Sequence, residues 1–150
     1  MNLEKLSAWE RGSLSRSGNE LHYPSPNRKT DVYLQYAGEV RFGPAYFNLI
    51  VGGTRIRDRL FGGEIFWSND SKYFAVQEWL STEESQGPHT RLVLFNAETR
   101  QESAVKECMG GFVSALRFYP ESFTYQEERG PARHLWNAAY DELANWKTIA

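Results

Sequence analysis

Histidine and cysteine are the side chains best suited to bind metals or to act as bases and nucleophiles near neutral pH. The three histidines, His22, His89 and His134, lie 67 and 45 residues apart, with no Cys/His/Asp cluster at ligand spacing. A zinc site normally shows at least one close pair of ligands. The sequence therefore predicts no metal site.

The single cysteine, Cys108, stands just before the Gly110-Gly111 pair. A thiol there acts as a nucleophile only if a histidine comes close in the folded chain. Single cysteines more often serve as small buried hydrophobic residues, and we interpret Cys108 as an inert thiol in the core or on the surface.

Glycines and carboxylates form no recognisable catalytic pattern. The glycine pairs lack the spacing of a phosphate-binding loop, and no Gly-x-Ser-x-Gly elbow occurs. Adjacent carboxylates such as Glu83-Glu84 would point to opposite faces of a strand, so sequence cannot place two of them as an acid/base pair. We predict no catalytic residue and no cofactor, and keep a small carboxylate-dependent hydrolase or sugar-binding enzyme as an alternative.

Three arginines, Arg55, Arg57 and Arg59, stand at every second position. On a strand all three would project from one side and form a basic stripe suited to phosphate or to an acidic surface. The interpretation that we favour is an edge strand protected by charge.

The connection from Ser81 to His89 is longer than a hairpin needs and carries Glu83 and Glu84, with Trp79 beside it. Loops on a rigid β scaffold often carry binding function. An acidic loop with an aromatic neighbour suits a basic partner, so we predict partner binding at Trp79, Glu83, Glu84 and His89. A solvated connection without function is the alternative.

The elements that position these residues belong to a β-rich domain. A chain of 150 residues can bury a core of its own, and its aromatic share of 15% suits half-buried sheet surfaces. One cysteine excludes an intramolecular disulfide, and the sequence shows neither a signal peptide nor the run of ~18 apolar residues that a membrane span needs. We expect a cytoplasmic protein of bacterial type that does not contact a membrane.

The charge of the chain is uneven along its length. The net charge of −2 does not favour nucleic acid as a partner. Residues 1–60 carry nine basic and six acidic side chains, whereas residues 61–150 carry eight and thirteen. The acidic second half favours a protein partner with a basic surface, such as a toxin, and a solvated acidic face is the alternative.

Short apolar runs alternate with turn signals from Glu20 onward, which is the pattern of strands. We expect residues 1–18 to form an arm or short helix and 19–150 a single β-rich domain. The run at 91–95 is apolar on both faces and predicts an interior strand. The expected strands cover residues 32–36, 46–51, 64–67, 73–79, 91–95, 112–118, 123–126 and 134–139, and a helical turn is expected at 141–146.

These segments repeat along the chain. Residues 23–29 and 66–72 each precede a strand, and Ser25 matches Ser68 as Lys29 matches Lys72, at an offset of 43. A weaker third copy begins at Phe118. Repeats of 40–50 residues with several strands each are typical of β-propeller blades and of similar arrays of meanders.

The segments 65–76 and 92–99 resemble one blade of a TolB-type or WD-repeat-like β-propeller, most strongly over residues 64–102. The resemblance implies that Trp67 packs between blades and that Asp70 shapes a tight turn, while Arg100 replaces the usual glycine of the next turn. Closed propellers have about 4–8 blades, so three units predict an open sheet or a sandwich. The resemblance implies architecture and at most a binding role.

We therefore expect an all-β fold of antiparallel meanders in three blade-like units. The function that we predict is a non-enzymatic protein-interaction module, such as an immunity or inhibitor protein that neutralises a bacterial toxin through an acidic surface. Besides the hydrolase, a structural subunit of an oligomeric propeller-like assembly is a further alternative, so the oligomeric state is left open.

Overall fold

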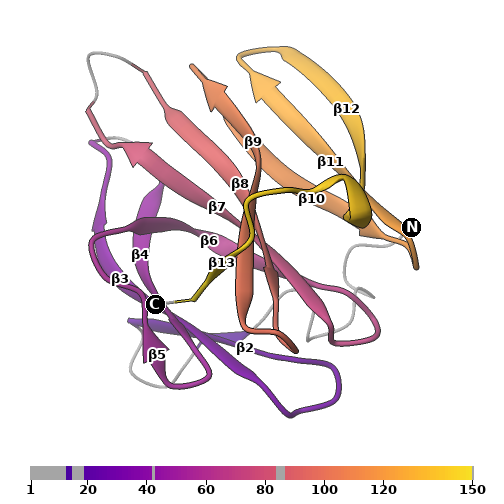
Figure 1. Cartoon of the computed structure of the whole chain (residues 1–150). Helices are drawn as coiled ribbons and strands as arrows, with labels where there is room; N and C mark the ends of the chain where they lie inside the picture. The colour runs from indigo at the N-terminus through magenta and orange to yellow at the C-terminus, as the bar shows by residue number, and fades with distance from the viewer. Residues whose placement is uncertain (1–12, 15–18, 42, 84–86, 150) are drawn as a thin grey trace.

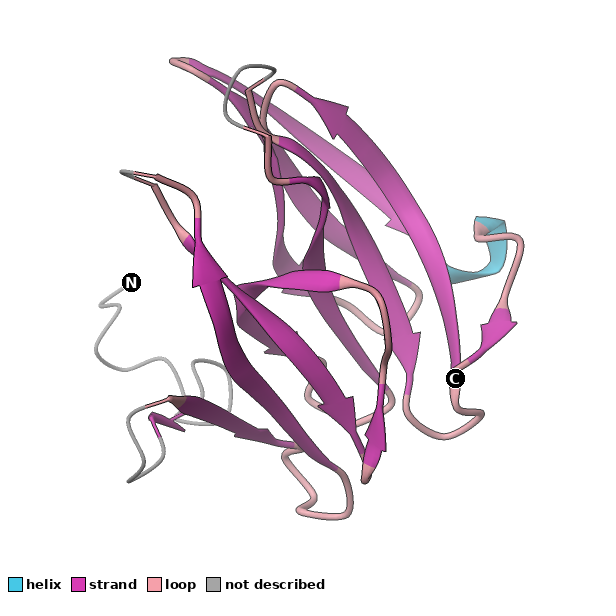
Figure 2. Cartoon of the chain, turned by 90° about the vertical axis from the view of Figure 1, so that its left-hand side faces the viewer, coloured by secondary structure: helices cyan, strands magenta, loops and turns pink. Residues whose placement is uncertain are grey.

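The structure is a computed structural model that describes residues 13–14, 19–41, 43–83 and 87–149. Antiparallel strands make up most of this part of the chain, as Figure 1 shows. Its single helical turn is the 3-10 helix Tyr140–Glu142, drawn in cyan in Figure 2. None of the described segments forms a helix that is long and apolar enough to cross a membrane. The predicted all-β class is confirmed.

The strands form three consecutive meanders, which we call units 1, 2 and 3. Unit 1 contains β1 (Ser13–Leu14), β2 (Glu20–Pro24), β3 (Asp31–Glu39), β4 (Ala45–Val51) and β5 (Thr54–Arg55). Unit 2 contains β6 (Leu60–Trp67), β7 (Tyr73–Ser81), β8 (His89–Asn96) and β9 (Gln101–Met109). Unit 3 contains β10 (Phe112–Phe118), β11 (Ser122–Arg129) and β12 (Ala132–Ala139), after which β13 (Lys147–Thr148) returns to the edge of β9.

The two predicted copies of the tight turn fold alike. The Ser68 hydroxyl accepts a hydrogen bond from the backbone N–H five residues further on (3.0 Å) and lies 2.6 Å from the Asp70 carboxylate. The Ser25 hydroxyl makes the same pair of contacts, at 3.0 Å to the backbone and 2.7 Å to Asn27. Short polar side chains that bond to nearby backbone groups favour turns of this kind, which explains why the repeat was visible in the sequence.

Units 1 and 2 pack against each other through the first hydrophobic core. The buried indole of Trp67 donates a hydrogen bond to the Tyr23 carbonyl (3.0 Å), and the Tyr23 hydroxyl donates to the Gly63 carbonyl (2.7 Å). Arg100, which has φ 57°, reaches from the β8–β9 turn to the Thr54 hydroxyl of unit 1 (3.0 Å). The largest fully buried side chains of this core are Phe61, Phe74, Phe95, Leu34, Leu49, Ile56, Ile65, Val32 and Val51.

Units 2 and 3 enclose the second core, because the sheet of unit 3 lies over the other face of β7–β9 (Figure 1). β8 lies between β7 and β9, and its residues 92–96 are all buried, so the predicted interior strand is confirmed. On β11 the buried residues Phe123, Tyr125 and Glu127 alternate with half-buried polar ones. The outer face of β11 is therefore polar, and the described strands form an open array rather than a ring.

Two expected elements differ from the structure. The arm at 1–18 includes a described strand, because Ser13–Leu14 pair with β2, while the other residues of the arm, with the expected short helix, lie outside the described residues. The helical turn expected at 141–146 is instead the 3-10 helix at 140–142. The rest of that segment extends towards β9, where Lys147 and Thr148 pair with Glu102 and Gln101.

Candidate functional site

Trp79, a predicted binding residue, is buried rather than displayed on the surface. It lies near the end of β7 on the face towards β10, with 6% of its surface exposed. Its ring meets the ring of Phe112 edge-on, at 5.6 Å between centroids and 84° between planes. A register shift between Trp79 and Ser81 in the β7–β8 pairing follows at once, and bulges of this kind re-aim side chains next to binding sites.

A cavity of about 330 Å³ opens beside Trp79 and has mostly apolar walls. A second cavity, of about 230 Å³, adjoins the first and shares Trp79, Phe112 and Pro44 with it. The first cavity, which we call the Trp79 cavity, is lined by Val40, Arg41, Pro44, Trp79, Ser81, Thr82, Glu83, Gly87, Pro88 and Phe112. Its size suits a single side chain or a short peptide segment rather than a large ligand.

The indole N–H of Trp79 is buried and has no hydrogen-bond partner in the described part of the protein. A buried donor that lost its water without gaining an acceptor costs about 1–3 kcal/mol. Such donors are uncommon in folded proteins, and those that occur call for an explanation. Here the donor belongs to one of the three residues that both cavities share.

The rim of the Trp79 cavity carries charge of both signs. Glu83 is exposed, and its backbone N–H donates to the Ser81 hydroxyl (3.2 Å), which holds the start of the loop in a tight turn. Arg41 lines the same cavity from the connection between β3 and β4 in unit 1. Glu84 lies outside the described residues.

His89 does not line the Trp79 cavity. Its Nε2 forms a short contact with the carboxylate of Glu107 on the neighbouring strand β9. The structure thus brings together two of the four predicted residues, Trp79 and Glu83, and directs His89 elsewhere. Sequence reasoning missed Pro44 and Phe112, because they come from units 1 and 3 and no local pattern links them to Trp79.

The β9–β10 turn places Phe112 against Trp79. The Gly110 N–H donates to the Pro88 carbonyl (2.7 Å), and the Thr90 hydroxyl donates to the Gly111 carbonyl (2.7 Å). Gly110 has φ 79°, which favours glycine. Gly111 is needed for another reason, since a Cβ there would lie 2.1 Å from the Glu128 carbonyl oxygen.

Replacing Gly111 with alanine is therefore expected to destabilise the fold by about 1–3 kcal/mol or more, because the close neighbour is backbone and cannot turn away. Urea unfolding followed by tryptophan fluorescence measures this change. Gly53→Ala is a partial control, since a Cβ there has open space and only its φ of 84° opposes the change. Equal losses in the two variants would contradict the assigned role of the close contact.

The three arginines at spacing two do not form a stripe on one strand. β5 ends at Arg55, Ile56 turns into the core, and Asp58 adopts φ 60° in the loop that leads to β6. Arg55 bonds to Gln35 (2.9 Å) and Arg57 is exposed. The expectation of a continuous strand was wrong, although all three arginines line one shallow depression.

Arg59 is half-buried and belongs to a cluster of four charged residues. Its guanidinium binds the Glu78 carboxylate through Nε and Nη2 (both 2.9 Å) and the Glu102 carboxylate through Nη1 (2.9 Å), while Arg91 also binds Glu78 (2.7 Å). Burial lowers the pKa of Arg59, but the hydrogen bonds and charges of the two glutamates outweigh it and raise that pKa above its ordinary value. These carboxylates act as structural counter-ions.

His22 and Cys108, two further candidates for chemistry, also have structural contacts or are buried. His22 lies 2.7 Å from Asp31 and stacks on Tyr33. Cys108 is fully buried, and burial raises the pKa of its thiol, which disfavours the reactive thiolate. No group of three or more His, Cys, Asp or Glu side chains suited to a metal ion occurs among the described residues.

The fold and this site define an all-β protein with an apolar-walled cavity at the junction of its three units. No protein-family model matches the chain, and neither do any curated protein or any solved structure. What the cavity can bind has to be inferred from its own geometry.

Proposed function

We propose that the chain is a non-enzymatic protein-interaction module that binds its partner at the Trp79 cavity. The observation that carries this proposal is the buried indole N–H of Trp79, which has no acceptor among the described residues and belongs to a side chain that lines both cavities. A partner group that enters the cavity and accepts this hydrogen bond removes the cost of the unmet donor. Tryptophan is also among the residues most enriched at binding hot spots.

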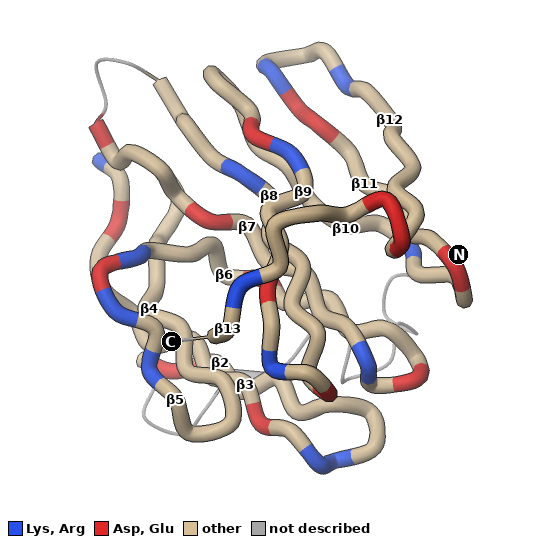
Figure 3. The backbone as a smooth tube through the Cα atoms, viewed as in Figure 1, with Lys and Arg blue, Asp and Glu red and all other residues tan. Residues whose placement is uncertain are grey.

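The partner that fits carries a basic side chain next to a hydrogen-bond acceptor. Glu83 supplies an exposed carboxylate at the rim, and the walls from Pro44 and Phe112 accept an aliphatic stem. An immunity or inhibitor protein that covers the basic cleft of a bacterial toxin in the cytoplasm is the concrete form of this proposal. Figure 3 shows basic and acidic residues interspersed along the backbone. The charge complementarity that we propose between this protein and its partner is therefore confined to the rim of the Trp79 cavity.

One observation favours this function over the hydrolase. Glu78 and Glu102, a pair of buried carboxylates close together, are both bound by Arg59 and serve as its counter-ions.

The test is affinity capture from the source cells, followed by calorimetric titration of the captured protein with variants. Trp79→Phe keeps an aromatic ring but removes the donor, and Glu83→Lys reverses the charge of the rim. We expect Trp79→Phe to weaken binding roughly tenfold or more, since the lost hydrogen bond is worth about 1–3 kcal/mol. Glu83→Lys should slow association and weaken binding, most strongly at low salt.

Matched controls are Trp146→Phe, a half-buried indole in the segment between β12 and β13, and Glu98→Lys, an exposed carboxylate in the β8–β9 turn. Both should leave the affinity unchanged. If Trp79→Phe and Glu83→Lys bound every captured protein as tightly as the unmodified chain does, the proposal would be wrong. A chain that turned over a substrate would be evidence for the hydrolase instead.

A further inference from the structure

β12 is an exposed edge strand. It has eight residues, pairs on one side with β11, and exposes its first six residues to solvent. In the described part of the chain no strand pairs with its other side. A strand of this length presents a row of free backbone N–H and C=O groups that can pair with another strand.

The two outer edges of the larger sheet are partly covered by the chain itself. β1 pairs with β2 at Leu21 and His22, and β13 pairs with β9 at Gln101 and Glu102. The segment after β12 does not fold back on β12 but crosses to β9, as Figure 1 shows. Unit 3 therefore has three strands where unit 2 has four.

β12 also lacks the usual protection of an edge. Its pairing with β11 runs without a register shift from Ser122↔Ala139 to Arg129↔Ala132, and it contains no proline. Arg133 and His134 are its only ionisable side chains. At its centre Leu135 is 72% exposed and Trp136 is 42% exposed. Long, regular edges with apolar centres are the ones that associate.

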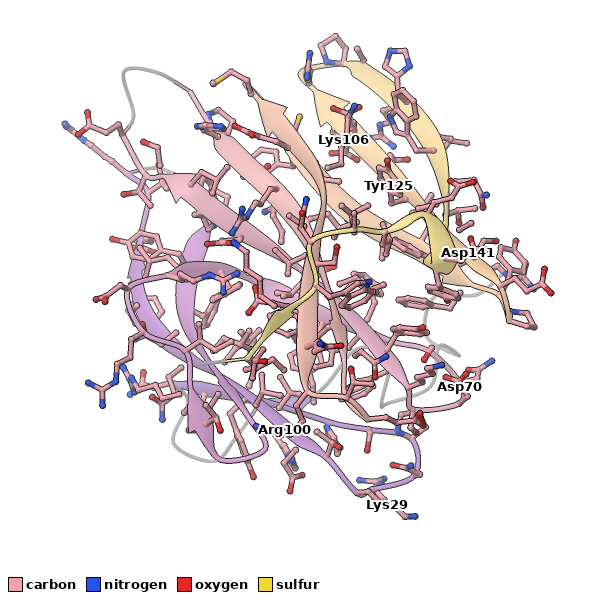
Figure 4. All side chains as sticks on the ribbon, in the orientation of Figure 1. Lys29, Asp70, Arg100, Lys106, Tyr125 and Asp141 are labelled. Carbon is pink, nitrogen blue, oxygen red and sulfur yellow. The ribbon has the colours of Figure 1, made fainter. Side chains whose placement is uncertain are left out.

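The edge is already ordered for pairing. The Trp136 indole donates to the Glu127 carboxylate (2.7 Å), stacks on Tyr125 at 6.5 Å between centroids, and lies 4.5 Å from the ammonium of Lys106. Lys106 and Tyr125 lie near each other on β9 and β11 in Figure 4. Little conformational freedom is therefore lost when a further strand binds, which favours association.

We infer that β12 is a self-association surface, on which the β12 strand of a second copy pairs antiparallel about a two-fold axis. Opposed residues in such a pair face the same side of the sheet. The two-fold axis must therefore pass midway between the two copies of one residue, so that this residue lies opposite itself. An axis at Leu135 places the most exposed apolar side chain opposite its own copy and His134 opposite Trp136. Arg133 then lies opposite Asn137.

This register keeps like charges apart. The two copies of Arg133 lie four positions from each other along the strand, or about 13 Å, which is beyond the screening length of charges in physiological salt. No carboxylate occurs on β12 that would favour a foreign basic strand over a second copy. The result is one continuous antiparallel sheet across both copies, β10-β11-β12-β12-β11-β10.

Sedimentation equilibrium of the purified full chain tests the inference. We expect the mass to rise from the 17.3 kDa monomer towards twice that value between micromolar and millimolar concentration. Leu135→Lys places two positive charges against each other at the axis and should raise the dissociation constant at least tenfold. The matched control is Leu116→Lys, because Leu116 is 49% exposed on β10 and the same change there should have no effect.

A charge-swap experiment fixes the register. Leu135→Lys and Leu135→Glu should each be monomeric alone and should form a mixed dimer when combined in equal amounts. A monomer for the unmodified chain at all concentrations would overturn the inference. So would a dimer that Leu135→Lys leaves intact, or a mixture that stays monomeric. The capture experiment on Trp79 and Glu83 uses other residues, so the two proposals succeed or fail separately.

Discussion

Replacing Arg59 with methionine is expected to lower the free energy of unfolding by about 3–5 kcal/mol, because two buried carboxylates lose the cation that both bind. Glu78 is 4% exposed and Glu102 is 8% exposed, so water cannot solvate them well. Arg59 contacts both with one guanidinium, at 2.9 Å to Glu78 and at 2.7–2.9 Å to Glu102. Of these two carboxylates Arg91 binds Glu78 alone, so it would not replace Arg59 as the partner of Glu102.

Chemical denaturation at neutral pH measures this loss, with Arg57→Met as the matched control. Arg57 stands two residues earlier and is exposed, so its replacement should change stability by no more than about 0.5 kcal/mol. Arg59→Lys should recover only part of the loss, since an ammonium cannot make the paired contacts of a guanidinium fork. Equal stability of Arg59→Met and Arg57→Met would show that the cluster contributes nothing to the fold.

Replacing Phe123 with alanine is expected to cost about 3–5 kcal/mol, the range for a large aromatic side chain deleted from a packed core. Phe123 has no exposed surface and lies within 5.5–5.8 Å of three other rings, those of Phe118, Tyr125 and Tyr140. These rings belong to the core that joins unit 3 to unit 2. The change therefore tests the packing between units as well as the packing within unit 3.

Urea unfolding followed by both far-UV circular dichroism and tryptophan fluorescence measures the effect. If the three units form one cooperative domain, both signals should shift together in the variant. Leu116→Ala is the control, because that leucine is 49% exposed on the same sheet and should cost little. A variant in which only part of the signal shifts would show that unit 3 unfolds by itself, contrary to the single domain expected from the sequence.

The proposed interaction site illustrates how far sequence reasoning reached. The loop at 81–89 stands out in the sequence because it is long, acidic and next to an aromatic residue, and Trp79 and Glu83 do lie on one cavity. The sequence did not predict the contacts that Trp79 and His89 make. Trp79 was expected to flank the loop, yet it is buried against Phe112 from another unit, and His89 bonds to Glu107.

The sequence by itself determined the features that depend on neighbouring residues. The serine and the Asn or Asp of each repeated turn bond to backbone within a few positions, so the turns at 25–30 and 68–73 form locally and mark the units. Strand positions followed from apolar runs between such turns. The interior position of β8 followed from a run that is apolar on both faces, because only a strand covered on both sides can bury it.

Only the tertiary structure decided which of these elements meet. Arg59 looked like a surface arginine at spacing two, and its burial depends on Glu78 and Glu102, which lie 19 and 43 residues further on. The Trp79 cavity needs Pro44 from unit 1 and Phe112 from unit 3. The free edge of β12 exists because the last segment crosses to β9. Each outcome depends on contacts between residues that are distant in the chain, whose energies no local pattern records.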